Sequence, residues 1–191
     1  KRQPQRLSDK NAEKIDFVVL RECTEGLFYT AAVHNRNKIA NNDEVEDIMR
    51  ITRNTTTRLH NFAFKLAEKR KQKGKLGKVT CVDKANVFKS QALFRKIFNE
   101  IKDDFPNIEA DTCYVDAMAL NLIRQPWEYD VMVMENIFGD ILSDLGGGLV
   151  GGMGMASCGE IGDNHGLFQP AHGSAPCLLY TSDAADDVAS V

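Results

Sequence analysis

The sequence predicts an α/β protein whose sheet is at least partly parallel. Short apolar runs rich in β-branched residues alternate with longer segments in which apolar residues recur every three or four positions. This alternation is typical of strand–helix–strand units. Polar and charged residues directly follow several strand-like runs, where parallel sheets place ligand contacts. These residues are Arg21, Lys84, Asp116 and Asp140.

The first third of the chain is expected to hold a connector, a strand and a long helix. Residues 1–14 are polar and basic and predict a connector. Residues 14–21 predict a strand, buried on both faces because its apolar residues are continuous. Residues 24–30 are expected to lead into a second extended piece. A helix is expected from about position 42 to Gly74, and its three threonines at 55–57 favour a kink or break.

The end of that helix carries seven basic residues and one acid between positions 65 and 78. Cations are favoured at a helix C-terminus by the helix dipole, so we interpret this run as a helix end rather than an anion-binding patch.

The remaining elements are predicted from apolar periodicity, caps and proline stops. They are strands at 78–84, 108–115 and 129–135, a helix capped by Ser90 and carrying Leu93, Ile97, Phe98 and Ile101, and helices at 116–124 and 136–145. The glycine-rich run at 146–154 contains G-x-G-x-x-G, but it follows a helix and does not join a strand to one. We therefore expect close packing or a turn there, and no dinucleotide fingerprint.

Composition argues against several classes of protein. The net charge of -3 gives no reason to expect nucleic acid or an acidic membrane as partner. No apolar run reaches the roughly 18 residues of a membrane span. The five cysteines are scattered, which argues against a disulfide framework or zinc ribbon and favours a reducing compartment, hence a cytoplasmic protein.

The strand ends carry the residue types of a metal-assisted reaction. Asp140 and Asp144 would share one helix face, as cation ligands or as two solvated acids. With Asp116 they offer three carboxylates for Mg²⁺ or Mn²⁺. Arg21 would fit a substrate carboxylate, and Lys84 could move a proton. Taken alone, each residue also has a purely structural explanation, in which Arg21 pairs with Glu22, Lys84 pairs with Asp83, and Asp116 caps a helix.

Five ordered motifs resemble the metal-dependent β-decarboxylating dehydrogenases, the isocitrate/isopropylmalate dehydrogenase family, and most resemble its isopropylmalate branch. They stand at residues 20–26, 82–87, 114–119, 136–144 and 169–176. The resemblance implies a three-layer α/β/α fold that is not a Rossmann fold and is incomplete here. Residues 15–176 would hold a dimerisation subdomain and part of a cofactor-binding subdomain. Residues 177–191 resemble translated sequencing adapter and are expected to be non-native.

The resemblance also implies an activity and its residues. The activity is oxidative decarboxylation of a 2-hydroxy di- or tricarboxylic acid with NAD and Mg²⁺ or Mn²⁺, as in leucine biosynthesis, by a homodimer whose subunits share sites. Phe28 stands where the family has a tyrosine acid, and the adjacent Tyr29 would face the other way. The implied residues are Lys84 and Asp116 for catalysis, Arg21, Asn86 and Val87 for substrate, Asp116, Asp140 and Asp144 for metal, and His172, Gly173, Ser174, Ala175 and Pro176 for cofactor.

The sequence leaves several alternative functions open. Within the family they are an isocitrate- or tartrate-type enzyme. Outside it they are a Mg²⁺-dependent phosphoryl-transfer or hydrolase domain, disfavoured by the lack of a P-loop, or an inactive metal-binding fragment. The substrate side group and the choice of NAD or NADP are not determined.

Overall fold

The computed structural model describes residues 11–29, 39–40, 43–152 and 154–171 of the 191. The chain forms two compact units, residues 1–146 and 147–191. The predicted cofactor loop at 172–176 and the predicted non-native tail lie outside the described residues.

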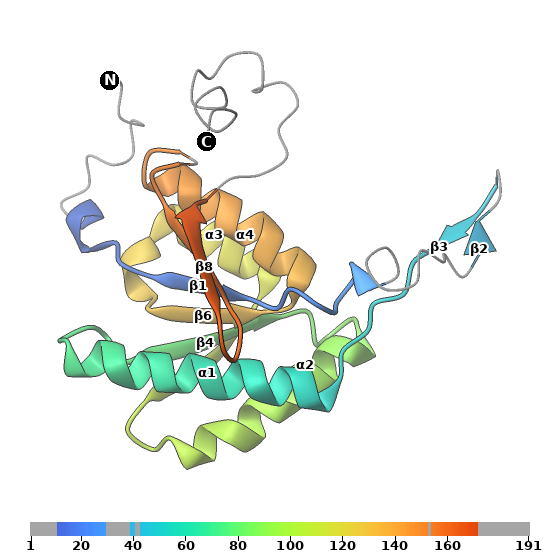
Figure 1. The fold of residues 1–191 in the computed structure, drawn as a ribbon, viewed down its shortest axis with the longest axis horizontal. Coiled ribbons are helices and arrows are strands. Elements are labelled where there is room, and N and C mark those ends of the chain that lie inside the picture. Colours follow the sequence, from blue (N-terminus) through green and yellow to red (C-terminus); the bar gives the residue numbers. More distant parts are fainter. Residues whose placement is uncertain (1–10, 30–38, 41–42, 153, 172–191) are drawn as a thin grey trace. The chain divides into compact units, whose positions relative to one another are not determined.

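A parallel sheet organises the first unit (Figure 1). Its strand order is β1-β6-β4-β5, which differs from the order of a Rossmann sheet. Arg21 pairs in register with Met134, and Met134 pairs with Val82, so the carboxyl ends of these strands lie at one edge. The strands are β1 Val18–Arg21, β4 Lys78–Asp83, β5 Glu109–Tyr114 and β6 Val131–Met134.

Helices cover both faces of this sheet. In Figure 1, α1 (Arg53–Gln72) and α2 (Lys89–Ile101) lie on one face, and α3 (Val115–Arg124) and α4 (Asn136–Leu149) lie on the other. The three-layer α/β/α prediction is thereby confirmed. Short 3-10 helices and strand pairs complete the description: η1 Ala12–Lys14, η3 Lys102–Asp104, η4 Pro126–Glu128, β2 Ile39–Ala40 with β3 Val45–Glu46, and, in the second unit, β7 Ser157–Ile161 with β8 Gly166–Pro170.

The core follows from strand alternation. On β6, Val131 and Val133 join the cluster formed with α1 and α2, so Met132 and Met134 point to the opposite face. All four are fully buried, as are Phe64, Phe94, Ile97 and Phe98 from the two helices and Met118, Leu122 and Leu142 from the other layer. Burial of both faces explains why the central strands read as continuous apolar runs.

One expectation at the start of the chain was wrong. β1 is only half-buried, because among the described residues it pairs with β6 alone at the edge of the sheet. Residues 24–28, which lead toward the second extended piece, form bends, a turn and a single bridge, Gly26 to Arg50, and residues 30–38 lie outside the described part of the chain.

The long helix begins at Arg53, about ten residues later than predicted. Thr52 is extended, and its backbone N–H and hydroxyl donate to Glu25 at 2.8 and 2.7 Å. The apolar periodicity before Thr52 does not mark a buried helix face, since the side chains of Val45 and Ile48 are 56% and 42% exposed. The threonines at 55–57 lie inside the helix without a break.

Two predicted helix boundaries also differ. Phe88, not Ser90, is the N-cap of α2, and Ser90 lies in the first turn. Helix α4 continues through the first glycines to Leu149, and positive φ begins at Gly151, with φ +115°. The glycine run therefore begins inside the helix and ends beyond it, and, as predicted, it does not join a strand to a helix.

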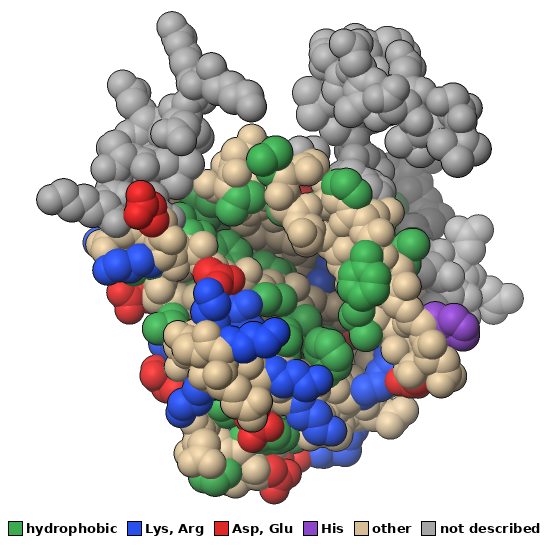
Figure 2. Space-filling model, turned by 60° about the vertical axis from the view of Figure 1, so that its left-hand side comes forward, with side chains coloured by type: hydrophobic (Ala, Val, Ile, Leu, Met, Phe, Trp, Pro, Cys, Tyr) green, Lys and Arg blue, Asp and Glu red, His purple; other side chains and the backbone are tan. Residues whose placement is uncertain are grey.

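The basic end of α1 has structural partners, as the helix-end interpretation requires. Arg70 binds Asp130 and Asp16, Lys75 binds Asp16 at 2.5 Å, and Lys71 donates to a backbone carbonyl. Figure 2 shows Lys and Arg side chains gathered on the face of the molecule that this view brings forward.

Two further findings bear on the sequence predictions. No helix in the described part of the chain has the length and hydropathy needed to cross a membrane. The four cysteines within the described residues (Cys23, Cys81, Cys113 and Cys158) are not joined to one another by disulfides.

Candidate active site

Most of the predicted site residues that are described lie at the carboxyl edge of the sheet or just beyond it. Arg21 ends β1, Lys84 follows β4, Asp116 follows β5, and α4 starts two residues after β6. Parallel strands place their carboxyl ends at one edge, so the sequence alone brings these side chains to one side of the molecule.

Arg21 is held by α4 through all three guanidinium nitrogens. Nη1 forms an ion pair with Asp140. Nε and Nη2 both donate to Asn136 Oδ1, at 2.9 and 2.7 Å. Asn136 is fixed in turn, because its Nδ2 donates to the Glu25 carbonyl at 3.1 Å. Arg21 therefore pairs with Asp140 and not with Glu22.

Close backbone approach makes this contact. Gly139 of α4 lies against Arg21, and a Cβ at that position would stand 2.6 Å from Arg21 Cβ and Cγ. Glycine thus lets the helix carrying Asp140 pack directly on the end of β1.

Asp140 and Asp144 stand one turn apart on α4, as predicted. Asp140 is half-buried under Arg21, and Asp144 is exposed. Repulsion between the two carboxylates is reduced by the arginine over the first of them. This pair offers two hard oxygen ligands on an accessible helix face.

Lys84 and Asp116 form a second ion pair, on the far side of β6 from Arg21. The hydrogen bond from Lys84 lowers the pKa of the Asp116 carboxyl below its ordinary value. Lys84 Nζ also lies 5.6 Å from the centre of the Tyr114 ring. Lys84 does not pair with Asp83, and Asp116 lies within the first turn of α3 and not at its cap.

The two ion pairs do not form one site within a single chain. Two strand spacings of about 4.8 Å separate β1 from β4, so Arg21 and Lys84 stand on the order of 10 Å apart along the edge. Within the residues described, no three His, Cys, Asp or Glu side chains are arranged to hold a metal ion. Asp116 is therefore not brought to Asp140 and Asp144 in one copy.

Phe28 and Tyr29 face different partners. The Phe28 ring lies 5.5 Å from Arg21 Cζ, on the side of the candidate site. The Tyr29 ring lies 4.6 Å from Arg50 Cζ. The predicted divergence of the two rings holds, although the segment is a turn and not an extended strand.

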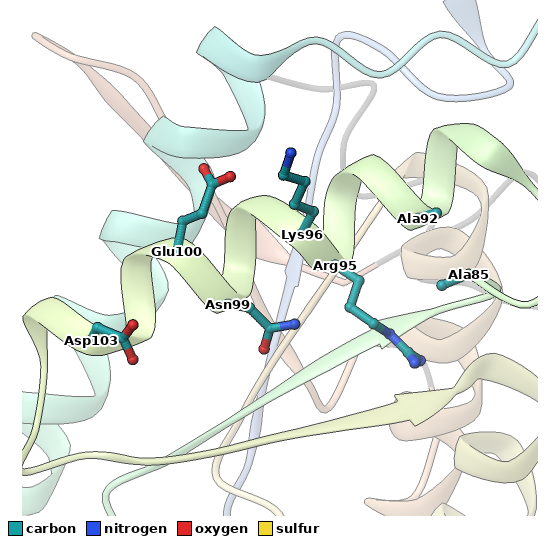
Figure 3. A pocket seen from close by; sticks show the side chains of 7 residues that line it. All are labelled: Ala85, Ala92, Arg95, Lys96, Asn99, Glu100 and Asp103. Carbon is teal, nitrogen blue, oxygen red and sulfur yellow. The ribbon is translucent and has the colours of Figure 1, made fainter.

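Asn86 and Val87 lie in the turn after β4 and are both exposed, Val87 to 59%. A shallow, open hollow of about 450 Å³ lies beside this turn and along α2 (Figure 3). Its walls include Ala85, Arg95 and Glu100, and Glu100 is paired with Arg53 at 2.5 Å. None of the predicted site residues lines this hollow.

Sequence reasoning missed a group of buried acids beside Arg21. Glu22, Glu25 and Glu135 are each less than 9% exposed. Glu22 accepts from the backbone of Thr24 at 2.8 Å, and Glu135 accepts from the Phe138 N–H at 3.1 Å at the start of α4. Burial raises the pKa of Glu135. Glu22 and Glu25 stand in a polar stretch and Glu135 ends an apolar one, and neither pattern signals that these acids are buried.

Gly26 makes room for this group. Its φ is +78°, and a Cβ there would stand 2.3 Å from Glu135 Oε2. Both the conformation and the space require glycine.

The fold and these side chains define an α/β protein with acids and cations along one edge of a parallel sheet. The family model for isocitrate/isopropylmalate dehydrogenase matches residues 2–190. The chain therefore belongs to the isocitrate/isopropylmalate dehydrogenase family, whose named relatives are oxidoreductases.

Individual relatives of this chain also have names that belong to this family. The 3-isopropylmalate/3-methylmalate dehydrogenase of Methanocaldococcus jannaschii is 47% identical over 163 residues, covering 85% of this chain and 47% of that protein. The homoisocitrate dehydrogenase of the same organism is 45% identical over 167 residues, covering 87% and 45%. The crystal structure of isocitrate dehydrogenase from Methylococcus capsulatus has a TM-score of 0.73 at 41% identity, covering 85% and 47%. The chain spans about half the length of the relatives it matches.

Proposed function

We propose that this chain supplies part of a metal-dependent dehydrogenase that oxidises and decarboxylates a 2-hydroxy di- or tricarboxylic acid with NAD, most like 3-isopropylmalate dehydrogenase. The supporting observation is the pair of incomplete sites on one sheet edge: Arg21 with Asp140, and Lys84 with Asp116. The names of the relatives support the reaction class, and they include 3-isopropylmalate and homoisocitrate enzymes.

A second copy of the chain would complete the site. Each copy carries Asp140 and Asp144 at one position and Lys84 with Asp116 at another, so a two-fold pair brings complementary halves together. Exposed apolar side chains on the layer that carries these acids suit such an interface. They are Leu120 and Ile123 on α3 and Ile141 on α4, which are 53%, 43% and 58% exposed.

The donor set fits a small divalent cation. Asp140 and Asp144 would hold it from one subunit and Asp116 from the other, all through carboxylate oxygen, the ligand that Mg²⁺ and Mn²⁺ prefer. When bound, such a cation supplies Lewis-acid polarisation of a substrate oxygen.

The remaining residues have roles that their chemistry allows. Arg21 would orient a substrate carboxylate through its planar guanidinium, which Asn136 already holds in place. Lys84 would take up the proton of the substrate hydroxyl as hydride leaves. Asn86 and Val87, exposed beside Lys84, would contact the substrate. The predicted cofactor contacts, His172 to Pro176, lie outside the described residues and rest on the family resemblance.

Phe28 removes the acid that the family resemblance implies for the last step. Its ring faces Arg21, so Phe28→Tyr would place a hydroxyl beside the site, whereas Tyr29 is engaged with Arg50. We expect Phe28→Tyr to raise turnover and Tyr29→Phe to leave it unchanged. Equal turnover in Phe28→Tyr and the parent would show that water or another group supplies the proton here.

A chimera tests the whole proposal. Residues 15–176 would replace the matching segment of the Methanocaldococcus jannaschii 3-isopropylmalate/3-methylmalate dehydrogenase. We expect a dimer that reduces NAD⁺ only with Mg²⁺ or Mn²⁺, compared across isopropylmalate, isocitrate and tartrate. Lys84→Met should abolish reduction, and Lys102→Met, a surface control, should not. A folded, dimeric chimera that reduces NAD⁺ with none of the three would refute the proposal.

A further inference from the structure

Tyr114 lies next to two cations at the end of β5. Lys84 Nζ is 5.6 Å from the centre of its ring, and Arg95 Cζ is 4.8 Å from that centre. Both distances are within the range in which the face of an aromatic ring attracts a cation. The ring is 37% exposed, so it does not serve mainly as core.

Arg95 is itself held firmly. Its Nε and Nη2 donate to the two carboxylate oxygens of Asp83, at 2.7 and 2.8 Å, in the two-point geometry that fixes a guanidinium plane. Asp83 is fully buried and also accepts from the Ala85 N–H at 2.8 Å. In Figure 3, Arg95 extends from α2 toward the Ala85 turn, away from Lys96 and Glu100.

These contacts connect α2 to the residues on both sides of Lys84. Asp83 precedes Lys84 in the chain and Ala85 follows it, and both are tied into the Arg95 pair. Beyond the backbone, the lysine side chain is long and flexible. Its ammonium has two described contacts, the Asp116 carboxylate and the Tyr114 ring.

We propose that Tyr114 and Arg95 are positioning residues that hold the Lys84 ammonium against Asp116. Arg95, fixed by Asp83, sets the Tyr114 ring, and the ring face limits where the ammonium lies. The catalytic role of this placement rests on the proposed function. The position of the Lys84 ammonium itself is a property of this chain and can be tested without activity. Arg95 also contacts the Tyr114 hydroxyl, and we expect the face of the ring, rather than that hydroxyl, to set the position of the ammonium.

The first test is spectroscopic and needs no activity. In the full chain labelled with [ε-¹³C]lysine, the Lys84 Hε signals, assigned with Lys84→Arg, should lie upfield because of the ring current of Tyr114. Tyr114→Leu should abolish the shift, Arg95→Lys should reduce it, and Tyr114→Phe should retain it. Lys78, whose Nζ lies 6.0 Å from the Tyr129 ring, is the internal reference and should not change.

Arg95→Lys keeps a cation for the buried Asp83 but lacks the planar fork. The Tyr114 variants change a partly exposed ring and leave that pair intact, so they remain informative if Arg95→Lys unfolds. A Lys84 shift that is the same in Tyr114→Leu as in the parent would overturn the proposal.

The second test is kinetic, in the dimeric chimera. We expect Tyr114→Leu to lower kcat by about tenfold to a hundredfold, the range for a displaced catalytic group, with KM for the hydroxy acid unchanged. Tyr114→Phe should rescue kcat. A lost shift with unchanged kcat would overturn the catalytic role of the placement. An inactive parent chimera would refute the proposed function, and the spectroscopic result would still decide the placement.

Discussion

Gly139→Ala should destabilise the protein, although alanine is the better helix former. The added Cβ would stand 2.6 Å from Arg21 Cβ and Cγ and 3.2 Å from its Cα. Carbon atoms pack best at about 3.5–4.0 Å, so α4 and the end of β1 must separate by about 1 Å. Because one of the atoms that it meets is backbone, side-chain rotation alone does not relieve the overlap.

The magnitude follows from three terms. Overpacking costs about 1–3 kcal/mol. Weakening one charge-assisted bond from Arg21 to Asn136 costs about 1.5 kcal/mol more. Replacing glycine by alanine inside a helix stabilises the folded state by about 1 kcal/mol. The expected net loss is about 2.5 kcal/mol, or about 5–10 °C in Tm for a chain of this size.

Gly148→Ala is the matched control in the same helix. A Cβ there meets nothing within 4 Å, so we expect no loss and a gain of up to about 1 kcal/mol. Urea and thermal unfolding, followed by circular dichroism on the full chain, measure both variants. A Gly139→Ala variant as stable as the parent would refute the close packing of α4 on Arg21.

Three further outcomes are expected. Asp130→Ala should cost about 1.5–3 kcal/mol in urea unfolding, because it removes the buried carboxylate that accepts from Arg70 and from the Gly77 N–H, whereas Asp16→Ala, at the more exposed partner of Arg70, should cost under about 1 kcal/mol. Burial lowers the pKa of His60 from 6.5 to about 4, so its contribution to stability is complete above pH 6.5 and falls by about 3 kcal/mol as pH drops to 4. The difference in stability between parent and His60→Gln across that window measures it, and a constant difference would contradict it. Asp144→Asn should weaken Mn²⁺ binding by the dimeric chimera at least tenfold in calorimetry, and unchanged affinity would remove Asp144 from the metal site.

The central fold was predictable because its strands are buried on both faces. β4 and β6 read as continuous apolar runs, and the helices between them carry clear three- and four-residue periodicity. Boundaries set by tertiary contacts were not predictable. The start of α1 depends on Glu25, which lies 27 residues before Thr52, and the apolar spacing upstream of Thr52 imitated a helix.

The sequence predicted where the residues of the candidate site lie, but not which partners they bind. Residues at strand ends were found because parallel strands end together. The plainer alternatives, in which Arg21 pairs with Glu22 and Lys84 with Asp83, do not hold, since Arg21 binds Asp140 and Asp83 binds Arg95, across the fold. The amide of Asn136 was within a recognised motif, yet nothing in the sequence showed that it fixes the arginine.

The assembly of two half-sites is the central claim, and mixed dimers test it most directly. A chimera carrying Lys84→Met and one carrying Asp144→Asn should each be inactive alone. Mixed after denaturation and refolding, they form heterodimers in which one of the two shared sites has both residues intact. We expect NAD⁺ reduction to return to about a quarter of the parent value, since half of the random dimers are mixed and each has one working site. No recovery in a mixture shown to contain heterodimers would contradict the account.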